Sequence, residues 1–367
     1  MRRLLFFFLF PILAFSQSVP LSPNAKVSVL TCGSSPEIYA LFGHTAIRIA
    51  DPDRGIDVVY NYGAFDFSTP NFALRFVKGD MQYFVTAGSF QDFIIQYDYE
   101  KRSISEQILD IPQEKKQQLF EELNAVLYSD ARYYTYKFID RNCTNMAMDV
   151  LNKSLGGKIL YKRKNLDTTY RDIIYPYFEG HFFERWGTSV LFGTKVDEQA
   201  TTLFLPTELE QSLALTTYDG KPIVSETKKL MTFPEQKPPF SLWNNIYIYL
   251  IFLTVVVVLN KKGLTAFYLI LVSLLGIFFA FSTLYSLHEE LAWNYNVLLF
   301  NPLWLPITIL LLRNRTKSFT YLGYTVLGCM VVYLLLAFNK AHFLIVLPMV
   351  AVNSIILLRL LSKNKAS

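Results

Sequence analysis

Residues 42–64 read FGHTAIRIADPDRGIDVVYNYGA, and this stretch decides the fold of the N-terminal part of the chain. Short β-strands are predicted at Ala46–Ala50 and Ile56–Tyr62, because both segments are rich in β-branched and apolar residues. The segment Asp51–Gly55 between them contains proline, aspartate and glycine and predicts a turn. Val27–Thr31 predicts one more strand before them. Consecutive strands joined by short connections are therefore expected here.

Further along, strand and helix patterns alternate. Arg102–Ile111 alternates apolar and polar residues, as a half-buried strand does. Gln113–Leu127 has apolar residues at helical spacing, and Thr144–Leu155 has a similar apolar face. Phe233–Pro239 is rich in proline and predicts a stiff linker. An α+β domain is therefore expected over residues 17–235.

The last third of the chain is far more apolar than the rest. Apolar residues make up 52% of the 367 residues and charged residues only 18%, whereas about a quarter of a soluble protein is charged. The excess lies in stretches near the length of a membrane span, and a helix satisfies its own backbone in lipid. We expect an all-α bundle of five transmembrane helices over residues 236–367, with spans at Leu242–Leu259, Leu264–Leu287, Val297–Leu312, Tyr321–Phe338 and Phe343–Leu358. This pattern excludes a wholly soluble protein.

The distribution of basic residues predicts how the spans are oriented. Lysine and arginine gather in Asn260–Lys262, in Arg313–Lys317 and in the C-terminal tail. The loops Ser286–Asn296 and Asn339–His342 together contain one lysine. By the positive-inside rule, the basic loops lie in the cytoplasm and the α+β domain lies outside it. The net charge of +5 is thus explained by membrane flanks, and no nucleic-acid partner is expected.

The N-terminus independently predicts export. Met1-Arg2-Arg3 is followed by the short apolar segment Leu4–Phe15, and small residues precede Gln17. This is the pattern of a signal peptide, predicted here as residues 1–16, and its apolar core is shorter than a membrane span. The signal peptide and the charges of the loops thus both predict that the α+β domain is exported.

The exported domain contains few residues suited to nucleophilic catalysis. His44 begins a predicted strand and Cys143 lies at the start of a predicted helix. The N–H groups of a helix N-terminus stabilise a thiolate and can hold an oxyanion. A histidine opposite that helix can act as the base, and Asn61 on the neighbouring strand can hold its ring. The hypothesis is a catalytic Cys143, His44 and Asn61.

The same residues also allow a reading without catalysis. A buried cysteine commonly packs as a small hydrophobe. In an oxidising compartment, Cys32 and Cys143 can form a disulfide bond. The residue types alone leave both alternatives open. No cysteine pairs at zinc spacing and no glycine-rich phosphate loop occur in the sequence, so neither a metal nor another cofactor is expected.

The order of the two motifs adds a resemblance. Phe42–Ile49, followed much later by Asn142-Cys143-Thr144, resembles the circularly permuted papain-like thiol hydrolases, of which lecithin:retinol acyltransferase is one. Over its full length the chain resembles the Bacteroidota lipoprotein N-acyltransferase family, in which a periplasmic thiol domain precedes membrane helices. The matching pieces are Cys32–Ile49, Tyr60–Phe65, Arg141–Thr144, Phe204-Leu205-Pro206, Trp293–Asn296 and Phe300-Asn301-Pro302.

This resemblance implies an enzyme of the inner membrane whose N-terminal domain lies in the periplasm. It implies that Cys143, activated by His44, takes a fatty acyl chain from a phospholipid as a thioester. It further implies transfer of that chain to the α-amino group of a diacylglyceryl-cysteine lipoprotein. The implied partners are the phospholipid donor, the diacylated lipoprotein acceptor and the membrane. A related envelope thiol hydrolase, such as a cell-wall peptidase or amidase, and a membrane-anchored module without activity are the alternatives.

Substrate contacts are predicted in two regions. The loop between the second and third spans should face the thiol domain, since both lie on the outer side. Its aromatic residues fit an interfacial belt and its polar residues fit a substrate role, and the sequence leaves both interpretations open. Tyr62, beside Asn61, and Tyr39 complete the candidates. The predicted loop contacts are His288, Glu289, Trp293, Asn294 and Asn296.

Overall fold

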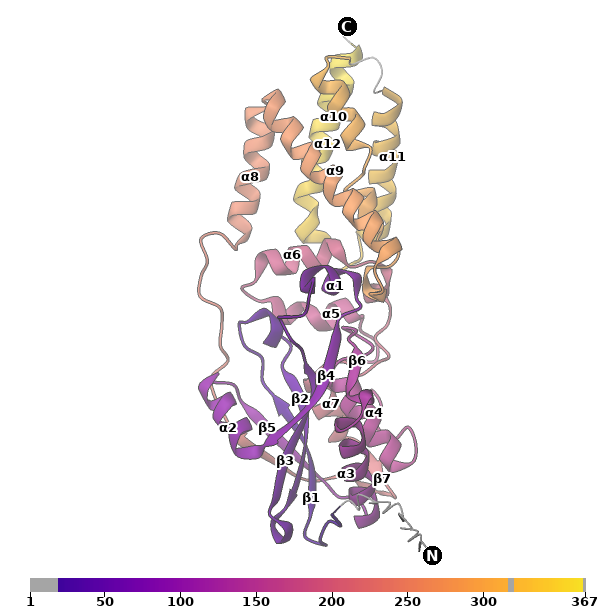
Figure 1. Ribbon diagram of the computed structural model, residues 1–367. Coiled ribbons are helices and arrows are strands. Elements are labelled where there is room, and N and C mark those ends of the chain that lie inside the picture. The colour runs from indigo at the N-terminus through magenta and orange to yellow at the C-terminus, as the bar shows by residue number, and fades with distance from the viewer. Residues whose placement is uncertain (1–18, 316–319, 366–367) are drawn as a thin grey trace, which may run out of the picture.

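The computed structural model describes residues 19–315 and 320–365. The predicted signal peptide, residues 1–16, lies outside the described residues. The N-terminal part is built around a β-sheet and the C-terminal part consists of helices, which are stacked on one end of the sheet part (Figure 1). A mixed α/β part followed by a helical part is therefore confirmed.

A seven-stranded sheet forms the centre of the N-terminal part, in the order β6-β4-β3-β2-β1-β5-β9. Every neighbouring pair is antiparallel, as short connections between consecutive strands allow. The strands predicted from the sequence correspond to β1, β2, β3 and β5. The strands are β1 (Lys26–Cys32), β2 (His44–Asp51), β3 (Ile56–Ala64), β4 (Gln82–Ser89), β5 (Ile104–Leu109), β6 (Tyr133–Thr135) and β9 (Val224–Met231), with a separate pair β7 (Thr217–Tyr218) and β8 (Lys221–Pro222).

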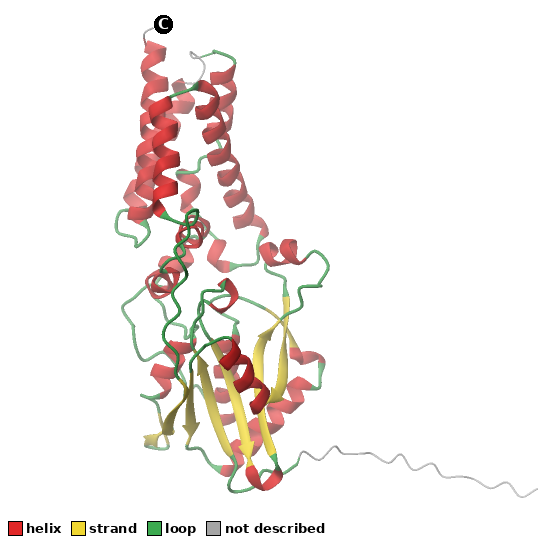
Figure 2. Cartoon of the chain, turned by 90° about the vertical axis from the view of Figure 1, so that its left-hand side faces the viewer, coloured by secondary structure: helices red, strands yellow, loops and turns green. Residues whose placement is uncertain are grey.

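Helices cover both faces of this sheet (Figure 2). On one face, α3 (Gln113–Leu127) and α4 (Cys143–Leu155) bury their apolar sides against residues such as Ile47 and Tyr60. On the other face, α2 (Phe90–Tyr99) packs Phe93 and Tyr97 over Ala46 and Val59. The alternation of side chains along each strand supplies apolar residues to both sides. Helix α3 has the predicted bounds, and α4 begins one residue before the prediction.

The remaining helices of the N-terminal part are short. They are α1 (Phe72–Lys78), α5 (Tyr170–Ile174), α6 (Phe182–Leu191) and α7 (Pro206–Leu213). Figure 1 shows α1, α5 and α6 at the end of the sheet part that faces the helical part.

The helical part contains three helices long and apolar enough to cross a membrane among the described residues, at Lys262–Tyr285, Thr320–Ala337 and Phe343–Ser362. Five full spans are not confirmed. The segments predicted as the first and third spans form helices of 14 and 9 residues, below the roughly 17 residues that a span needs. The helices are α8 (Ile246–Leu259), α9 (Lys262–Tyr285), α10 (Trp304–Leu312), α11 (Thr320–Ala337) and α12 (Phe343–Lys365).

Local contacts explain why the third predicted span is shortened. Pro302 has no N–H to continue a helix, and the Asn301 side chain accepts a hydrogen bond from the N–H of Leu303 at 3.0 Å. The backbone at Phe300 instead packs directly on α9, where a Cβ at Gly276 would lie 1.4 Å from the Phe300 carbonyl oxygen. Only glycine permits this approach. Hydropathy alone does not report such an interruption.

The two parts share a polar interface. Asn294, in the connection between α9 and α10, donates to the carbonyl oxygens of Val190 and Leu191 at 2.9 and 2.8 Å. These carbonyls end α6, where a helix has no acceptor partners of its own. Asn296 donates to the carbonyl oxygens of Ser189 and Phe192 in the same way. The connection therefore caps a helix of the sheet part and fixes the two parts against each other.

Candidate functional site

Cys143 is the first residue of α4, and the residue before it shapes this helix start. The Asn142 side-chain oxygen accepts from the N–H groups of Thr144 and Asn145 at 2.9 and 3.2 Å. The Asn145 side chain accepts in return from the Asn142 N–H at 3.0 Å, which completes a capping box. Among the hydrogen bonds of the described residues, the Cys143 N–H donates none. The helix therefore presents a thiol and a free N–H together.

His44 and Asn61 lie on adjacent strands of the sheet. In the register of β2 and β3, Ala46 is opposite Asn61, so His44 and Asn61 project from the same face. The His44 Nε2 and the Asn61 Oδ1 are 3.2 Å apart. An amide oxygen only accepts hydrogen bonds, so this contact assigns the ring proton to Nε2 and leaves Nδ1 for the thiol.

The glycine before His44 is required by the backbone. Gly43 has φ +79°, and a Cβ there would lie 2.5 Å from the Cys32 carbonyl oxygen. Only glycine combines this conformation with such a close approach. The Phe-Gly-His sequence thus places the histidine at the start of β2, beside the start of α4.

Cys143 and His44 form a hydrogen-bonded pair whose pKa values move in opposite directions. Burial by itself raises the pKa of Cys143, but the charge of His44 and hydrogen bonds from His44, Thr45 and Thr144 outweigh it, so the pKa is lowered. Burial by itself lowers the pKa of His44, but Cys143 and Asn61 raise it above its usual value. Each of these shifts favours the charged form of its group, the thiolate of Cys143 and the imidazolium of His44.

Replacing Asn61 should change the pH range over which the Cys143 thiolate and the His44 imidazolium exist together. The thiolate forms as pH rises through the lowered cysteine pKa, and the imidazolium is lost as pH rises through the raised histidine pKa. Because Asn61 raises the His44 pKa, Asn61→Ala should lower it. For a reaction of Cys143 that needs the His44 imidazolium, the alkaline limb of the pH–rate profile should therefore move to lower pH. Asn61→Asp, with a charged acceptor, should move it to higher pH. Identical alkaline limbs in all three proteins would exclude this positioning role.

Tyr134 is a residue of this site that the sequence did not indicate. Its hydroxyl is buried and has no hydrogen-bond partner among the described residues, and the whole residue is 2% exposed. A Cβ built at Gly63 would lie 3.8 Å from the Cys143 Cβ and 3.9 Å from the Tyr134 hydroxyl oxygen. Burial and then the nearby Cys143 charge raise the tyrosine pKa, so the hydroxyl keeps its proton. A buried donor without a partner calls for an explanation, and here this donor and Cys143 both lie near Gly63.

The structure places the other predicted residues in several different environments. Tyr62 follows Asn61 but is buried in the core under α3 and α4, whereas Tyr39 is exposed. Trp293 is exposed as well, and Asn294 and Asn296 are buried in the interface described above. The substrate contacts of these residues remain predictions.

The loop after α9 contacts the segment that leads to Cys143. The Glu290 carboxylate accepts from the N–H of Ile139 at 2.9 Å, and Lys137 donates to the carbonyl oxygen of Leu287. His288 contacts the Phe76 carbonyl oxygen through its Nε2 at 2.9 Å, and Glu289 lies 3.7 Å from Lys195. The loop therefore contacts the segment before Cys143 from the side of the helical part.

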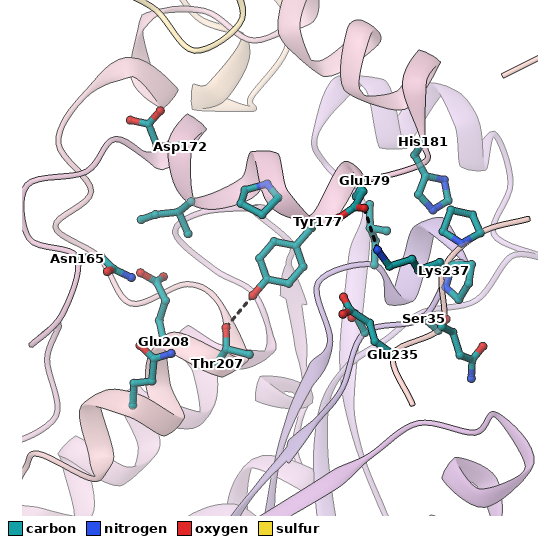
Figure 3. Close-up of a pocket in the computed structure, with 18 of the residues that line it drawn as sticks. Ser35, Asn165, Asp172, Tyr177, Glu179, His181, Thr207, Glu208, Glu235 and Lys237 are labelled. Carbon is teal, nitrogen blue, oxygen red and sulfur yellow. Dashed lines mark hydrogen bonds and ion pairs between the residues drawn. The ribbon is translucent and has the colours of Figure 1, made fainter. Parts of the chain in front are cut away.

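A cleft of about 590 Å³ lies nearby but is separate from this site. Figure 3 shows its polar lining, in which Tyr177 and Thr207 are hydrogen-bonded and Lys237 pairs with Glu179. None of Cys143, His44 and Asn61 lines it.

Neither disulfide bonding nor a metal cluster is found among the described residues. Cys32, Cys143 and Cys329 are free thiols. Cys32 is buried, and this burial raises its pKa to about 12, which makes it a poor nucleophile. In residues 19–315 and 320–365, no group of three or more histidine, cysteine, aspartate or glutamate side chains is arranged to hold a metal.

Comparison with known proteins gives one match. Residues 18–174 match the family model described as the Lnb N-terminal periplasmic domain. This range includes His44, Asn61, Tyr134 and Cys143 and ends before α6. No curated protein and no solved structure matches the chain significantly. The match indicates an Lnb-like envelope protein with a periplasmic N-terminal domain, and the three span-length helices indicate that it is a membrane protein.

Proposed function

We propose that this chain is a lipoprotein N-acyltransferase of the inner membrane, with its N-terminal domain in the periplasm and a permuted papain-like arrangement of its catalytic residues. It moves a fatty acyl chain from a phospholipid to the α-amino group of a lipoprotein's diacylglyceryl-cysteine. The observation that carries the proposal is the Cys143–His44–Asn61 arrangement at a free helix N-terminus. The Lnb domain match and the attached membrane helices support it.

The proposed reaction has two balanced steps. The Cys143 thiolate attacks the ester carbonyl carbon of the phospholipid, the carbon–oxygen bond breaks, and the His44 imidazolium protonates the departing lysophospholipid oxygen. The acceptor's neutral amine then attacks the thioester, the carbon–sulfur bond breaks, and His44 takes the amine proton. Thiolate and imidazolium are thereby restored. A thioester suits this exchange because amines attack it readily.

The free N–H of Cys143 and the hydroxyl of Tyr134 are the donors we assign to the oxyanion of each tetrahedral intermediate. Both are preorganised, since a helix cap holds one and a buried tyrosine cluster holds the other. Preorganised donors stabilise charge that develops only in the transition state.

The test uses purified full-length protein in phospholipid vesicles that contain an acyl-labelled phospholipid. We expect a labelled, hydroxylamine-sensitive protein adduct. On addition of a diacylated lipopeptide with a free N-terminus, the label should move to its amine as an amide. Release of free fatty acid without amide formation would instead support a thiol hydrolase. Absence of both products would support a module without activity.

Tyr134→Phe should slow formation of the thioester by about 10²-fold, because it removes one oxyanion donor. The phenylalanine ring keeps the packing against Tyr62 and Tyr83, so the folded state should be retained. The measurement is single-turnover labelling of Cys143 by the phospholipid.

Alkylation of Cys143 by iodoacetamide is the control reaction for the Tyr134→Phe variant. This substitution reaction develops no carbonyl oxyanion, so its rate should be close to that of the unmodified protein. Equal slowing of alkylation and acylation would assign Tyr134 a merely structural role.

A further inference from the structure

Helix α1 exposes apolar side chains that the sheet part leaves uncovered. Phe67, just before the helix, and Leu74 within it are 72% and 71% exposed, and Phe76 and Val77 are also exposed. Exposed apolar residues scattered singly are common, but a contiguous group marks an interaction site. This group lies on seven helical residues and the turn that precedes them.

Hydrogen bonds join α1 to the end of a membrane-length helix. Helix α9 ends at Tyr285, and the three residues after it all contact the end of α1. The N–H of Leu287 donates to the Lys78 carbonyl oxygen at 2.7 Å, and the Ser286 hydroxyl donates to the Val77 carbonyl oxygen at 2.9 Å. His288 contacts the Phe76 carbonyl oxygen. Helix α9 has 24 residues and is long and apolar enough to cross a membrane, so α1 is joined directly to one end of a candidate span.

The charges of α1 fit a lipid surface. The helix contains Arg75 and Lys78 and no acidic residue. Arg75 is exposed, while Lys78 pairs with Asp80 at 2.6 Å. Apolar side chains beside a basic one are the composition of a segment that lies in the membrane interface. A protein partner would equally bury the apolar side chains, but the contact with the end of α9 favours lipid.

Aromatic rings connect this surface with the nucleophile. Strand β3 passes Cys143 at Gly63. Phe65, two residues later, belongs to a series of neighbouring aromatic rings. Ring centroids are 4.7 Å apart for Phe65–Phe67 and 5.1 Å apart for Phe65–Tyr83. We name the whole series the aromatic track: Tyr134, Tyr83, Phe65, Phe67, Phe72 and Phe76, with successive centroids no more than 6.5 Å apart.

We propose that the exposed face of α1 inserts into the outer leaflet and that the aromatic track binds one fatty acyl chain of the donor lipid and guides its ester to Cys143. The assignment of the acyl chain rests on the proposed function, whereas insertion of α1 does not. Apolar contact along the track offsets the cost of drawing the chain out of the bilayer. The ligand class of the track is thus a long, unbranched hydrocarbon chain attached to an ester.

The first test locates α1 in the membrane. A benzoylphenylalanine photocrosslinker is placed at Leu74 in the full-length protein, which is reconstituted in labelled phosphatidylethanolamine–phosphatidylglycerol vesicles. We expect lipid adducts at Leu74. Ile95 is the matched control and should give few adducts, because it is exposed on α2, and α2 lies further from the helical part than α1 does (Figure 1). Equal yields of lipid adducts at Leu74 and Ile95 would contradict insertion of α1. So would protein adducts at Leu74 when the same crosslinking is carried out in native membranes.

The second test uses chain length. Phe67→Ser with Leu74→Ser should lower kcat/KM for thioester formation from a long-chain phospholipid by about tenfold. A water-soluble acetyl ester, which needs no track, should react at the unmodified rate. Ile95→Ser with Tyr128→Ser removes two exposed apolar residues elsewhere and should leave both rates unchanged.

The outcomes separate the two proposals. An equal loss of kcat/KM for the long-chain and the acetyl ester, or no loss for the long-chain one, would contradict binding of the acyl chain by the aromatic track. If the unmodified protein forms no thioester at all, the proposed function fails, and the crosslinking yields still decide whether α1 inserts.

Discussion

Cys143→Ala is expected to abolish the acyl-protein adduct and to lower N-acylation of the lipopeptide by on the order of 10⁴-fold or more. Without the sulfur no thioester forms, and the remaining His44 would have to direct the amine at an ester of the phospholipid. The loss should appear in kcat, because the thiol acts only in the chemical steps. Substrate binding should change little.

The measurement is mass spectrometry of the lipopeptide after incubation with phospholipid vesicles. Cys143→Ser is the second variant, since a hydroxyl preserves the helix start with nearly the same shape, and it should also be inactive at neutral pH. Cys329→Ala, in α11, removes a free thiol remote from the site and should retain full activity. A labelled, hydroxylamine-sensitive adduct on Cys143→Ala would show that another residue is the nucleophile.

His44→Ala is expected to reduce thioester formation by roughly 10³-fold. The charge of His44 is the first influence that lowers the Cys143 pKa against burial. Without the imidazole, only the hydrogen bonds from Thr45 and Thr144 still oppose the effect of burial, so the Cys143 pKa should rise. At neutral pH the thiolate is then scarce, and the leaving lysophospholipid oxygen has no proton donor.

Two readouts check the histidine prediction. In the unmodified protein, iodoacetamide should alkylate Cys143 at pH values below those at which an ordinary thiol reacts. In His44→Ala this profile should shift to higher pH. His181→Ala removes the other histidine of the N-terminal part and should leave the profile unchanged. An unshifted profile in His44→Ala would contradict the ion pair.

Local sequence patterns predicted much of the sheet part. The hairpin from His44 to Ala64 and the helix Gln113–Leu127 were predicted closely, because residues near in sequence encode a turn, an alternation or a helical stripe. The membrane helices were predicted less well. An apolar stretch says nothing about where a helix starts, and Pro302 and the contact of Phe300 with Gly276 shorten α10.

The sequence likewise indicated some residues of the candidate site and missed another. His44, Asn61 and Cys143 were nominated from residue type, strand order and a helix start, and the structure brings these three together. Tyr134 carried no such signal, since it is one of 23 tyrosines. The role we propose for it depends on a buried hydroxyl without a partner that lies near Gly63, as Cys143 does, and only packing decides this arrangement.

The sequence by itself determined the division into a mixed sheet part and an apolar helical part, and it nominated Cys143 and His44 as the candidate nucleophile and base. Hydropathy, turn residues and residue type are local properties, and they suffice for these conclusions. Only the tertiary structure decided that Asn294 and Asn296 cap α6, that the Tyr134 hydroxyl and Cys143 both lie near Gly63, and that α1 is joined to the end of α9. Those facts depend on contacts between residues far apart in the chain, which no local pattern encodes.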